Sequence, residues 1–361
     1  MSPFPAGTAL APERWRQARR LLLVRLDNLG DVILMTPAFR AIKETCPHIA
    51  LTLLASPTGA AVAPLVPELD DVIVYPAPWT DLTGDRPPDP SVELATLERL
   101  RAGRFDGAII FTSYHQSPLP AALLAYLAGI PLRHAASVDF PGRLLTSRHR
   151  HPDRRLHEVE RALDLVGALG FGTSDPAIRL RVPPAERAWA EARWPPGRPR
   201  IIVHPGCTAP ARAYPPALYA QVVARLTAQG AAVIVTGGPA ERALATQVAG
   251  PTALSLAGQT TLPQLAGLIA TADLVLTNNT GPMHLAAGLQ TPVVALFAQT
   301  NDPAQWGPWR VPHRLLYRPV DCALCRFFRC PYDNACLAAV SPETVVATVW
   351  DLLKTARRER P

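Results

Sequence analysis

The 361 residues are too many for one ordinary domain and predict two domains of roughly 150 to 180 residues each. Apolar residues make up 48% of the chain and charged residues 18%, which excludes a disordered polyelectrolyte. The 36 basic residues outnumber the 29 acidic ones, and nearly all of them are arginines. Arginines can bind an anionic ligand, but a general compositional bias toward arginine is the stronger interpretation. No apolar run approaches the ~20 residues of a membrane span, and residues 1–20 lack the apolar core of a signal peptide, so we expect a cytoplasmic protein.

In the first half of the chain, short apolar runs bounded by Gly, Pro or Asp alternate with longer stretches of helical period. This alternation predicts an α/β fold built on a parallel sheet. We expect strands at 21–26, 50–55, 71–74 and 108–111, and helices near 32–45, 90–101, 118–127 and 157–169.

A second series of the same kind begins at residue 200. We expect strands at 201–204, 232–236, 274–277 and 293–297, and helices near 216–229, 239–248, 261–270 and 283–289. The sequence therefore predicts two Rossmann-like domains, 1–172 and 200–361, joined by a Pro/Gly-rich linker at 173–199. The two domains should face each other across a cleft, with ligands at the C-terminal ends of the strands. Whether the last helix crosses back to the N-terminal domain stays open.

The first candidate site residue is Asp31, which follows the strand at 21–26 and a short polar loop. Its carboxylate falls at the start of a helix and at the C-terminal end of a strand, where it can cap the helix or act as a general base. From this observation alone, capping is the stronger interpretation. The loop lacks the G-x-G-x-x-G pattern, which counts against a dinucleotide site.

A second candidate is the turn after the strand at 274–277. Thr280 can cap the following helix, Gly281 lets the backbone approach a ligand, and Pro282 suits a first helical turn. With His284 one turn in, this helix start predicts a diphosphate site, although a purely structural turn is the alternative.

Two further strand ends carry polar residues that should reach the same crevice. After the loop at 204–206, Thr208 and Arg212 could contact a phosphate. After the strand at 232–236, Glu241 could contact ribose hydroxyls. Arg212 by itself would more often be a solvated arginine, so its importance depends on the neighbouring motifs.

For two more segments the sequence allows more than one role. Four cysteines with the spacing C-x2-C-x4-C-x5-C could hold a structural zinc, or could be reduced or redox-active thiols. These are Cys322, Cys325, Cys330 and Cys336. A basic stretch could meet an anionic acceptor or a membrane surface, or be a solvated loop. It contains Arg143, Arg148, His149, Arg150, His151, Arg154 and Arg155.

Taken together, these motifs resemble glycosyltransferase family 9, the ADP-heptose:lipopolysaccharide heptosyltransferase family of bacteria. The resemblance rests on GDVILMTPAFRAIKETCP, HPG with R-x-Y-P, GGPAE, and NNTGPMHLAAGLQTPVVALF with the later QWGPW, in order from about residue 21 to 346. It implies a GT-B fold with an N-terminal acceptor domain and a C-terminal donor domain. It also implies inverting, metal-independent transfer from a nucleotide-diphospho sugar, with no cofactor.

Carried over residue by residue, Asp31 resembles the catalytic base of the family. Arg212 stands where a phosphate-binding lysine of a K-x-W-P pattern is usual, and Glu241 resembles the ribose contact. The diphosphate loop corresponds to Asn279, Thr280, Gly281, Pro282 and His284. Asn279 replaces the usual aspartate of N-D-T-G-P, which leaves ADP-heptose as the family default for the donor sugar.

The resemblance further implies a glycan or glycolipid acceptor, peripheral contact with the inner face of the cell membrane, and no nucleic-acid partner. Two rival functions stay open. One is a sugar-nucleotide epimerase of the same fold, which would act without an acceptor. The other is a non-catalytic sugar-nucleotide or glycan-binding protein, which Asn279 favours and the retained Asp31 disfavours.

Overall fold

The computed structural model describes residues 12–80, 89–113, 116–322 and 324–358. The chain divides into two compact units, Met1–Pro176 and Ala177–Pro361. The boundary falls inside the segment 173–199, and α7 (Pro184–Glu191) of that segment packs against α10 (Leu262–Ala270) of the second unit. None of the helices in the described part of the chain is long and apolar enough to cross a membrane.

The first unit is built on a parallel sheet of six strands in the order β3-β2-β1-β4-β5-β6. The central strand reads RLLLVR and is buried from its second residue on, because helices cover both faces of the sheet. The strands are β1 (Arg20–Arg25), β2 (Ala50–Ala55), β3 (Asp71–Val74), β4 (Gly107–Ile110), β5 (Leu132–Ala136) and β6 (Ser147–His149).

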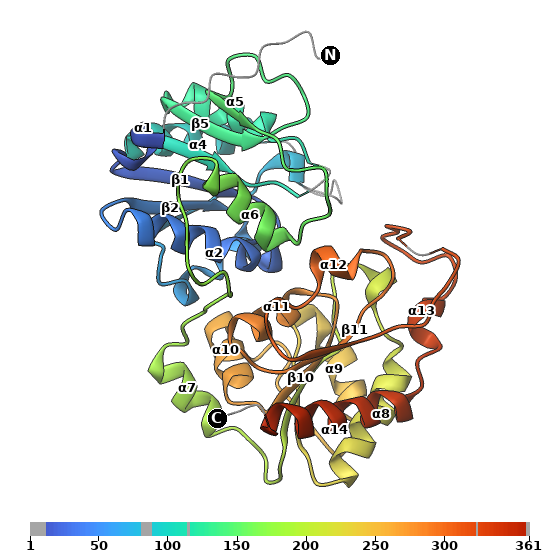
Figure 1. The fold of residues 1–361 in the computed structure, drawn as a ribbon. Coiled ribbons are helices and arrows are strands. Elements are labelled where there is room, and N and C mark those ends of the chain that lie inside the picture. The colour runs from blue at the N-terminus through green and yellow to red at the C-terminus, as the bar shows by residue number, and fades with distance from the viewer. Residues whose placement is uncertain (1–11, 81–88, 114–115, 323, 359–361) are drawn as a thin grey trace. The chain divides into compact units, whose positions relative to one another are not determined.

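Helices α2 and α6 pack together on one face of this sheet, and α4 and α5 cover the other (Figure 1). On the α4 and α5 side, Leu22 and Val24 of β1 meet Leu100 and Phe105 in a buried apolar cluster. The helices of the unit are α1 (Pro12–Arg16), α2 (Leu29–Thr45), α3 (Pro57–Ala60), η1 (Ala63–Leu65), η2 (Pro78–Thr80), α4 (Pro90–Gly103), α5 (Leu119–Leu127) and α6 (Glu158–Gly167).

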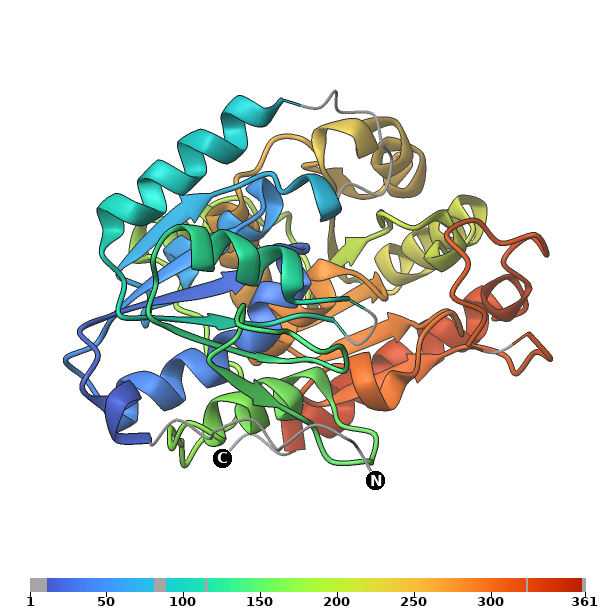
Figure 2. The same cartoon turned by 90° about the horizontal axis from the view of Figure 1, so that it is seen from above.

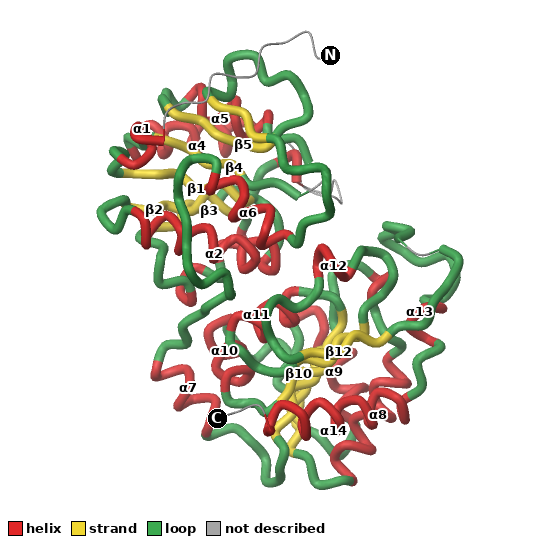
Figure 3. Tube along the Cα trace, viewed as in Figure 1, coloured by secondary structure: helices red, strands yellow, loops and turns green. Residues whose placement is uncertain are grey.

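The second unit repeats this plan with a parallel sheet in the order β12-β11-β10-β7-β8-β9. Its strands are the yellow layer between red helices in Figure 3. They are β7 (Arg200–His204), β8 (Ala232–Val235), β9 (Leu254–Ser255), β10 (Leu274–Asn278), β11 (Val293–Leu296) and β12 (His313–Leu316).

On one face of this sheet α8 packs against α9 and α14, and on the other face α10 packs against α11 (Figures 1 and 2). The last helix, α14, contacts β10, β11 and β12 and so belongs to the second unit. The remaining bounds are η3 (Pro210–Arg212), α8 (Pro216–Ala228), η4 (Pro239–Glu241), α9 (Arg242–Ala249), α11 (Gly281–Gly288), α12 (Pro303–Trp306), α13 (Ala335–Ala338) and α14 (Pro342–Arg358).

In both sheets the direction of winding reverses at the centre. The chain runs outward from β1 through β2 to β3, and then returns to add β4 on the other side of β1. The second unit does the same with β7 and β10. Ligands of doubly wound sheets bind where the strand order reverses, at the carboxyl ends of the strands. Ligands are therefore expected at the loops after β1, β4, β7 and β10.

The predicted α/β architecture is confirmed, and each of the eight expected strands is present within a residue or so of its expected bounds. Four strands of the described structure were not expected, namely β5, β6, β9 and β12.

Candidate active site

The loop after β1 is organised by a buried arginine. Arg25, the last residue of β1, has no exposed side-chain surface. Its Nε lies 3.0 Å from Asp27 Oδ2, and its Nη2 lies 3.0 Å from Asp31 Oδ1. Nη2 also donates to Ser113 Oγ beyond β4, at 2.7 Å. One guanidinium therefore links the two central strand ends of the unit and holds two carboxylates.

Asp31 lies in the first turn of α2, and its second oxygen has a partner too. The backbone N–H of Asn28 donates to Asp31 Oδ2 at 3.1 Å, which is one half of a capping box. Burial raises the pKa of Asp31 above its usual value. The charge of Arg25 opposes this rise, and the nearby Asp27 carboxylate adds to it. A carboxyl group with a raised pKa is better suited to accept a proton near neutral pH than an ordinary aspartate.

Burial by itself lowers the pKa of the Arg25 guanidinium, but three carboxylates outweigh it and raise the pKa. They belong to Asp27, Asp31 and Glu158. Arg25 is therefore a permanent cation, and it stabilises the ionised form of Asp31.

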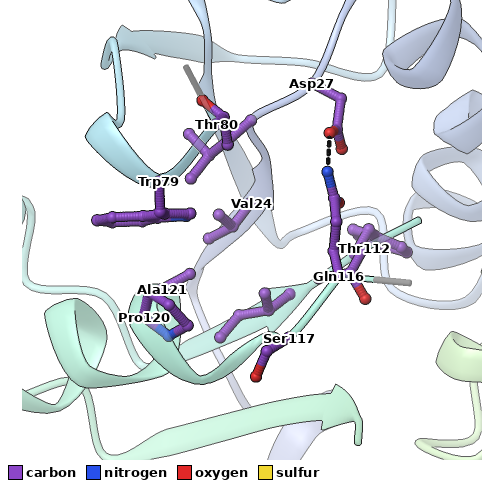
Figure 4. A pocket seen from close by; sticks show the side chains of 12 residues that line it. Val24, Asp27, Trp79, Thr80, Thr112, Gln116, Ser117, Pro120 and Ala121 are labelled. Carbon is purple, nitrogen blue, oxygen red and sulfur yellow. Dashed lines mark hydrogen bonds between the residues drawn. The ribbon is translucent and has the colours of Figure 1, made fainter. Parts of the chain in front are cut away.

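A cavity of about 310 Å³ opens beside this network, at the C-terminal ends of β1 and β4. Figure 4 shows Trp79 on one side of it, and Asp27 with Gln116 on the other. Gln116 Nε2 donates to Asp27 Oδ1, and Gln116 Oε1 accepts from the Ser113 backbone N–H. The lining residues are Val24, Leu26, Asp27, Trp79, Thr80, Ile110, Phe111, Thr112, Gln116, Ser117, Pro120 and Ala121.

In the second unit, Asn278 at the end of β10 connects the segments that carry the other motifs. Its side chain is fully buried, and its Oδ1 accepts from the Tyr214 backbone N–H (3.2 Å) and the Tyr219 hydroxyl (3.1 Å). Its Nδ2 donates to Pro205 O at 2.7 Å. The loop after β7, the R-x-Y-P segment and the turn before α11 are thus brought together by one amide.

The turn itself leads into α11 as expected, but the predicted cap is wrong in one respect. Thr280 occupies the N-cap position, yet its side chain makes no capping hydrogen bond. Pro282 has no N–H to offer, and the Met283 amide is already bonded to the Thr280 carbonyl at 3.0 Å. His284 is buried within α11, only 5% exposed, rather than displayed on the surface of the turn.

Asn279 is 3% exposed, and its Nδ2 has no hydrogen-bond partner within the described residues. A buried N–H without a partner is rare in folded proteins, because leaving one unpaired costs about 1–3 kcal/mol. Its position directly before the amino end of α11 makes it a candidate donor to a bound anion.

Glu241 lies over the backbone of the loop that follows β7. A Cβ atom added to Gly206 would collide with its carboxylate, so a larger residue there would displace Glu241 from this position. Glu241 Oε2 accepts from the Gly238 backbone N–H at 2.7 Å and lies 3.9 Å from His204 Nε2. Burial lowers the pKa of His204, so its imidazole tends to be neutral.

Arg212 ends the short helix η3, and its Nη2 donates to Asn301 Oδ1 at 3.1 Å. Both Arg212 and Glu241 act electrostatically on Cys207, whose pKa burial raises to about 11. Arg212 and Glu241 therefore flank the same loop, as the sequence predicts. Thr208 lies in that loop and is exposed.

The four clustered cysteines are half-buried free thiols that together line a small cavity of about 10 Å³.

In the basic stretch, Arg148 donates through Nε to Ser137 O at 2.8 Å, and His149 and His151 contact Asp164. These side chains point to protein partners, so the stretch is not a uniformly solvated basic surface.

Sequence reasoning missed the two residues that organise these sites. Arg25 directly follows the apolar run 21–24 of β1, and a charge at the buried end of that strand was the available signal. Asn278 is the last residue of a buried strand. A polar side chain at a buried strand end was the signal that could have identified it.

Two doubly wound α/β units, each with polar loops at its central strand ends, are the architecture of the GT-B fold. Residues 94–335 match the sequence profile of glycosyltransferase family 9 (heptosyltransferase), and the chain belongs to this family. It is 25% identical over 296 residues to lipopolysaccharide heptosyltransferase 3 of Escherichia coli, covering 78% of this chain and 83% of that protein.

Solved structures share the fold at lower identity. The family 9 glycosyl transferase of Veillonella parvula has a TM-score of 0.79 at 21% identity, covering 96% of this chain and 98% of the other. Escherichia coli ADP-heptose lipopolysaccharide heptosyltransferase II has a TM-score of 0.73 at 21% identity, covering 94% and 99%.

Proposed function

We propose that the protein transfers a sugar from a nucleotide-diphospho sugar to a glycan or glycolipid of the cell envelope, with inversion and without a metal ion. ADP-heptose is the donor that family membership favours, and the lipopolysaccharide heptosyltransferases among its relatives support an envelope acceptor. The first unit would bind the acceptor, and the second unit would bind the donor.

The observation that carries this proposal is the Asp31 carboxylate, held by Arg25 and the Asn28 amide at the reversal point of the first sheet. In a direct displacement, the acceptor hydroxyl oxygen attacks the anomeric carbon while Asp31 takes the hydroxyl proton. The bond from that carbon to the diphosphate oxygen breaks, and its electron pair leaves with the nucleoside diphosphate. Attack opposite the leaving group inverts the anomeric centre.

Groups of the second unit are suited to the departing diphosphate. Arg212 supplies a permanent positive charge, and the start of α11 supplies the positive end of a helix dipole. The Asn279 Nδ2 adds a buried donor without a partner in the described residues. Glu241 has a second oxygen available to accept from ribose hydroxyls, since Oε2 bonds Gly238.

The donor set at the turn after β10 supports metal-independent transfer. Mg²⁺ sites at nucleotides use one or two carboxylates beside the phosphates. Here the turn offers the amides of Asn278 and Asn279, and the oxygen of the first already accepts two hydrogen bonds within the protein. Charge on the leaving group would then be stabilised by Arg212 and α11.

The cavity beside Asp27 supports binding of an uncharged part of the acceptor. Its walls combine apolar side chains with the ring of Trp79, which is 40% exposed, and with the hydroxyl and amide groups of Thr80 and Gln116. An aromatic ring beside hydrogen-bonding groups suits a sugar, which has one apolar face and a rim of hydroxyls.

Peripheral contact with the inner face of the cell membrane is part of the proposal. Val138 and Phe140 are 91% and 64% exposed, and the exposed Arg143 follows them in the chain. Exposed apolar side chains near a basic residue can rest on an anionic lipid surface, although the exposed Asp139 lies between these two.

Substitution of Asp31 tests the base. We expect Asp31→Asn and Asp31→Ala to reduce transfer by ~10²–10⁴-fold, the usual contribution of a general base, while nucleotide affinity stays nearly intact. Asp89→Asn is the matched control, because Asp89 also caps a helix, accepting from the Ser91 backbone N–H at 3.1 Å at the start of α4. Wild-type turnover in folded Asp31→Asn protein would reduce Asp31 to a capping residue and overturn the proposal.

A further inference from the structure

Two histidines and an aspartate meet at the open edge of the first sheet. His149 is the last residue of β6, and His151 follows two residues later, so both side chains can lie on the same side of an extended chain. Asp164 on α6 places Oδ2 2.7 Å from His149 Nε2 and 2.7 Å from His151 Nδ1. One ligand atom from each residue lies within 4.8 Å of the other two. Among the described residues, this is the one group of three His, Cys, Asp or Glu side chains with that geometry.

The surrounding structure holds these three side chains in place. His134 of β5, 3% exposed, lies between the strand and the helix that carry them. Its Nδ1 is 2.6 Å from Ser147 Oγ on β6, and its Nε2 is 3.2 Å from Leu165 O on α6. The ring of His149 packs between those of His134 and His151, with centroid distances of 6.1 and 4.9 Å. Two of the three side chains, those of His149 and Asp164, are therefore carried by a strand and a helix, and His151 lies in the loop directly after that strand.

Two nearby guanidinium groups have contacts of their own, although the charge of Arg161 also acts on His151. The Arg161 guanidinium lies 3.2 Å from the Glu158 carboxylate. Arg148 donates through Nε to Ser137 O at 2.8 Å and through Nη2 to Val138 O at 2.6 Å. Asp164 thus keeps a negative charge facing two imidazoles, and these three groups form a donor set that zinc and other divalent transition metals prefer.

Hydrogen bonding within the cluster is the competing explanation. One carboxylate oxygen that accepts two imidazole N–H groups satisfies all three residues without an ion. The side chains are nevertheless accessible, 14% exposed for each histidine and 33% for the aspartate, so an ion could enter and keep water ligands. Ligand atoms of a tetrahedral zinc lie roughly 3.4 Å apart, from bonds of about 2.1 Å. The two carboxylate–imidazole distances of 2.7 Å would each have to lengthen by about 0.7 Å to admit the ion.

The geometry points to a divalent transition-metal site, with zinc as the expected ion, formed by His149 Nε2, His151 Nδ1 and the Asp164 carboxylate and completed by water. Each imidazole would bind through the nitrogen that now contacts Asp164 and carry its proton on the other ring nitrogen. Bound metal would fasten the end of the edge strand β6 to α6. The site lies on elements other than the loops proposed for sugar transfer, and its role is structural.

The experiment measures metal binding by the full-length protein rather than its activity. Protein treated with a chelator is titrated with Zn²⁺ by calorimetry, and its melting temperature is followed with and without Zn²⁺. Binding is measured in wild type, His151→Ala, Asp164→Asn and two controls. His48→Ala removes an exposed histidine elsewhere in the unit, and Cys325→Ser disables the cysteine cluster as a competing zinc site.

We expect one Zn²⁺ per chain in wild type, His48→Ala and Cys325→Ser, with affinity lowered at least about tenfold in His151→Ala and Asp164→Asn. Co²⁺ bound to Cys325→Ser protein should show visible ligand-field bands without a thiolate-to-cobalt charge-transfer band. Absence of zinc binding in wild type, or binding lost in Cys325→Ser and retained in Asp164→Asn, would overturn the assignment. Asp164→Asn keeps the size and one acceptor oxygen of the aspartate, so it decides the question if His151→Ala does not fold.

Discussion

Arg25 is the residue whose replacement tests the proposed site most directly. Arg25→Met keeps the length of a buried side chain and removes the guanidinium that contacts Asp27 and Asp31 at 3.0 Å each. Arg25 stabilises the ionised form of Asp31, so its loss raises the pKa of Asp31. A base acts in its ionised form, and the acid limb of the pH profile of kcat/KM must therefore move to higher pH.

The size of this shift follows from the contact between Arg25 Nη2 and Asp31 Oδ1, at 3.0 Å. A hydrogen bond between charged groups is worth about 1.5–3 kcal/mol, and one pKa unit corresponds to about 1.4 kcal/mol. We therefore expect the acid limb to rise by about one to two pH units. The rate on the plateau above it should change little, since Asp31 is ionised there in both proteins.

Stability limits this experiment, because removing one partner of a buried ion pair costs about 3–5 kcal/mol of a total near 5–15 kcal/mol. Arg25→Lys provides a milder variant that keeps the charge but lacks the planar guanidinium that reaches both carboxylates and Ser113. The Arg25→Lys variant should also move the acid limb to higher pH, but by less than Arg25→Met does. Ser113→Ala removes a neutral partner of Arg25 (2.7 Å) and should leave the limb in place.

The assay is release of nucleoside diphosphate across the pH range, with folding checked by circular dichroism at each pH. An unmoved acid limb in folded Arg25→Met would mean that the titrating group is not Asp31, or that Arg25 does not govern it. A limb that moves to lower pH would contradict the sign of the argument.

Three further expectations concern the second unit. Arg212→Ala should weaken nucleoside diphosphate binding by about 1.5–3 kcal/mol while nucleoside binding changes little, and equal losses for both ligands in calorimetry would remove Arg212 from the phosphate site. Asn278→Ala should lower the free energy of unfolding by about 3 kcal/mol, roughly 1 for each lost hydrogen bond, with urea denaturation as the measurement. Asn279→Asp should change the ratio of kcat/KM values toward ADP-heptose by about 1–3 kcal/mol in a two-donor competition, because aspartate accepts where the amide N–H donates. An unchanged ratio would make position 279 part of the backbone scaffold only.

The strands that could be predicted most directly are those whose apolar runs are uninterrupted, such as 108–111 and 293–297, because a sheet covered on both faces needs apolar side chains on both. β5 reads LRHAA, and its two polar residues conceal it. Arg133 and His134 are 8% and 3% exposed. Arg133 donates to backbone carbonyl groups, including Leu144 O at 2.7 Å, and His134 contacts Ser147 and Leu165 O. Hydropathy cannot show that a polar side chain finds its partners inside the fold.

The site shows the same limit. Order and spacing of motifs were sufficient to select the loops after β1, β7 and β10, because parallel strands present their carboxyl ends at one edge of a sheet. They were not sufficient to identify Arg25 or Asn278, because both act through hydrogen bonds to distant parts of the chain. Arg25 donates to a residue 88 positions away, and Asn278 donates to one 73 positions away. Such partners become visible only when the chain is folded.

Asp31 shows why the two interpretations of a helix-start carboxylate need not exclude each other. The cap uses one lone pair of Oδ2, for the Asn28 amide, and Arg25 uses one lone pair of Oδ1. A carboxylate offers about four such positions, so capacity for a third donor remains. The two existing bonds fix the orientation of the carboxylate before the acceptor arrives, which is what a base acting in one geometry requires. Capping and proton transfer therefore make separable demands: loss of the cap lowers the free energy of unfolding, whereas loss of the base lowers kcat in protein that is still folded.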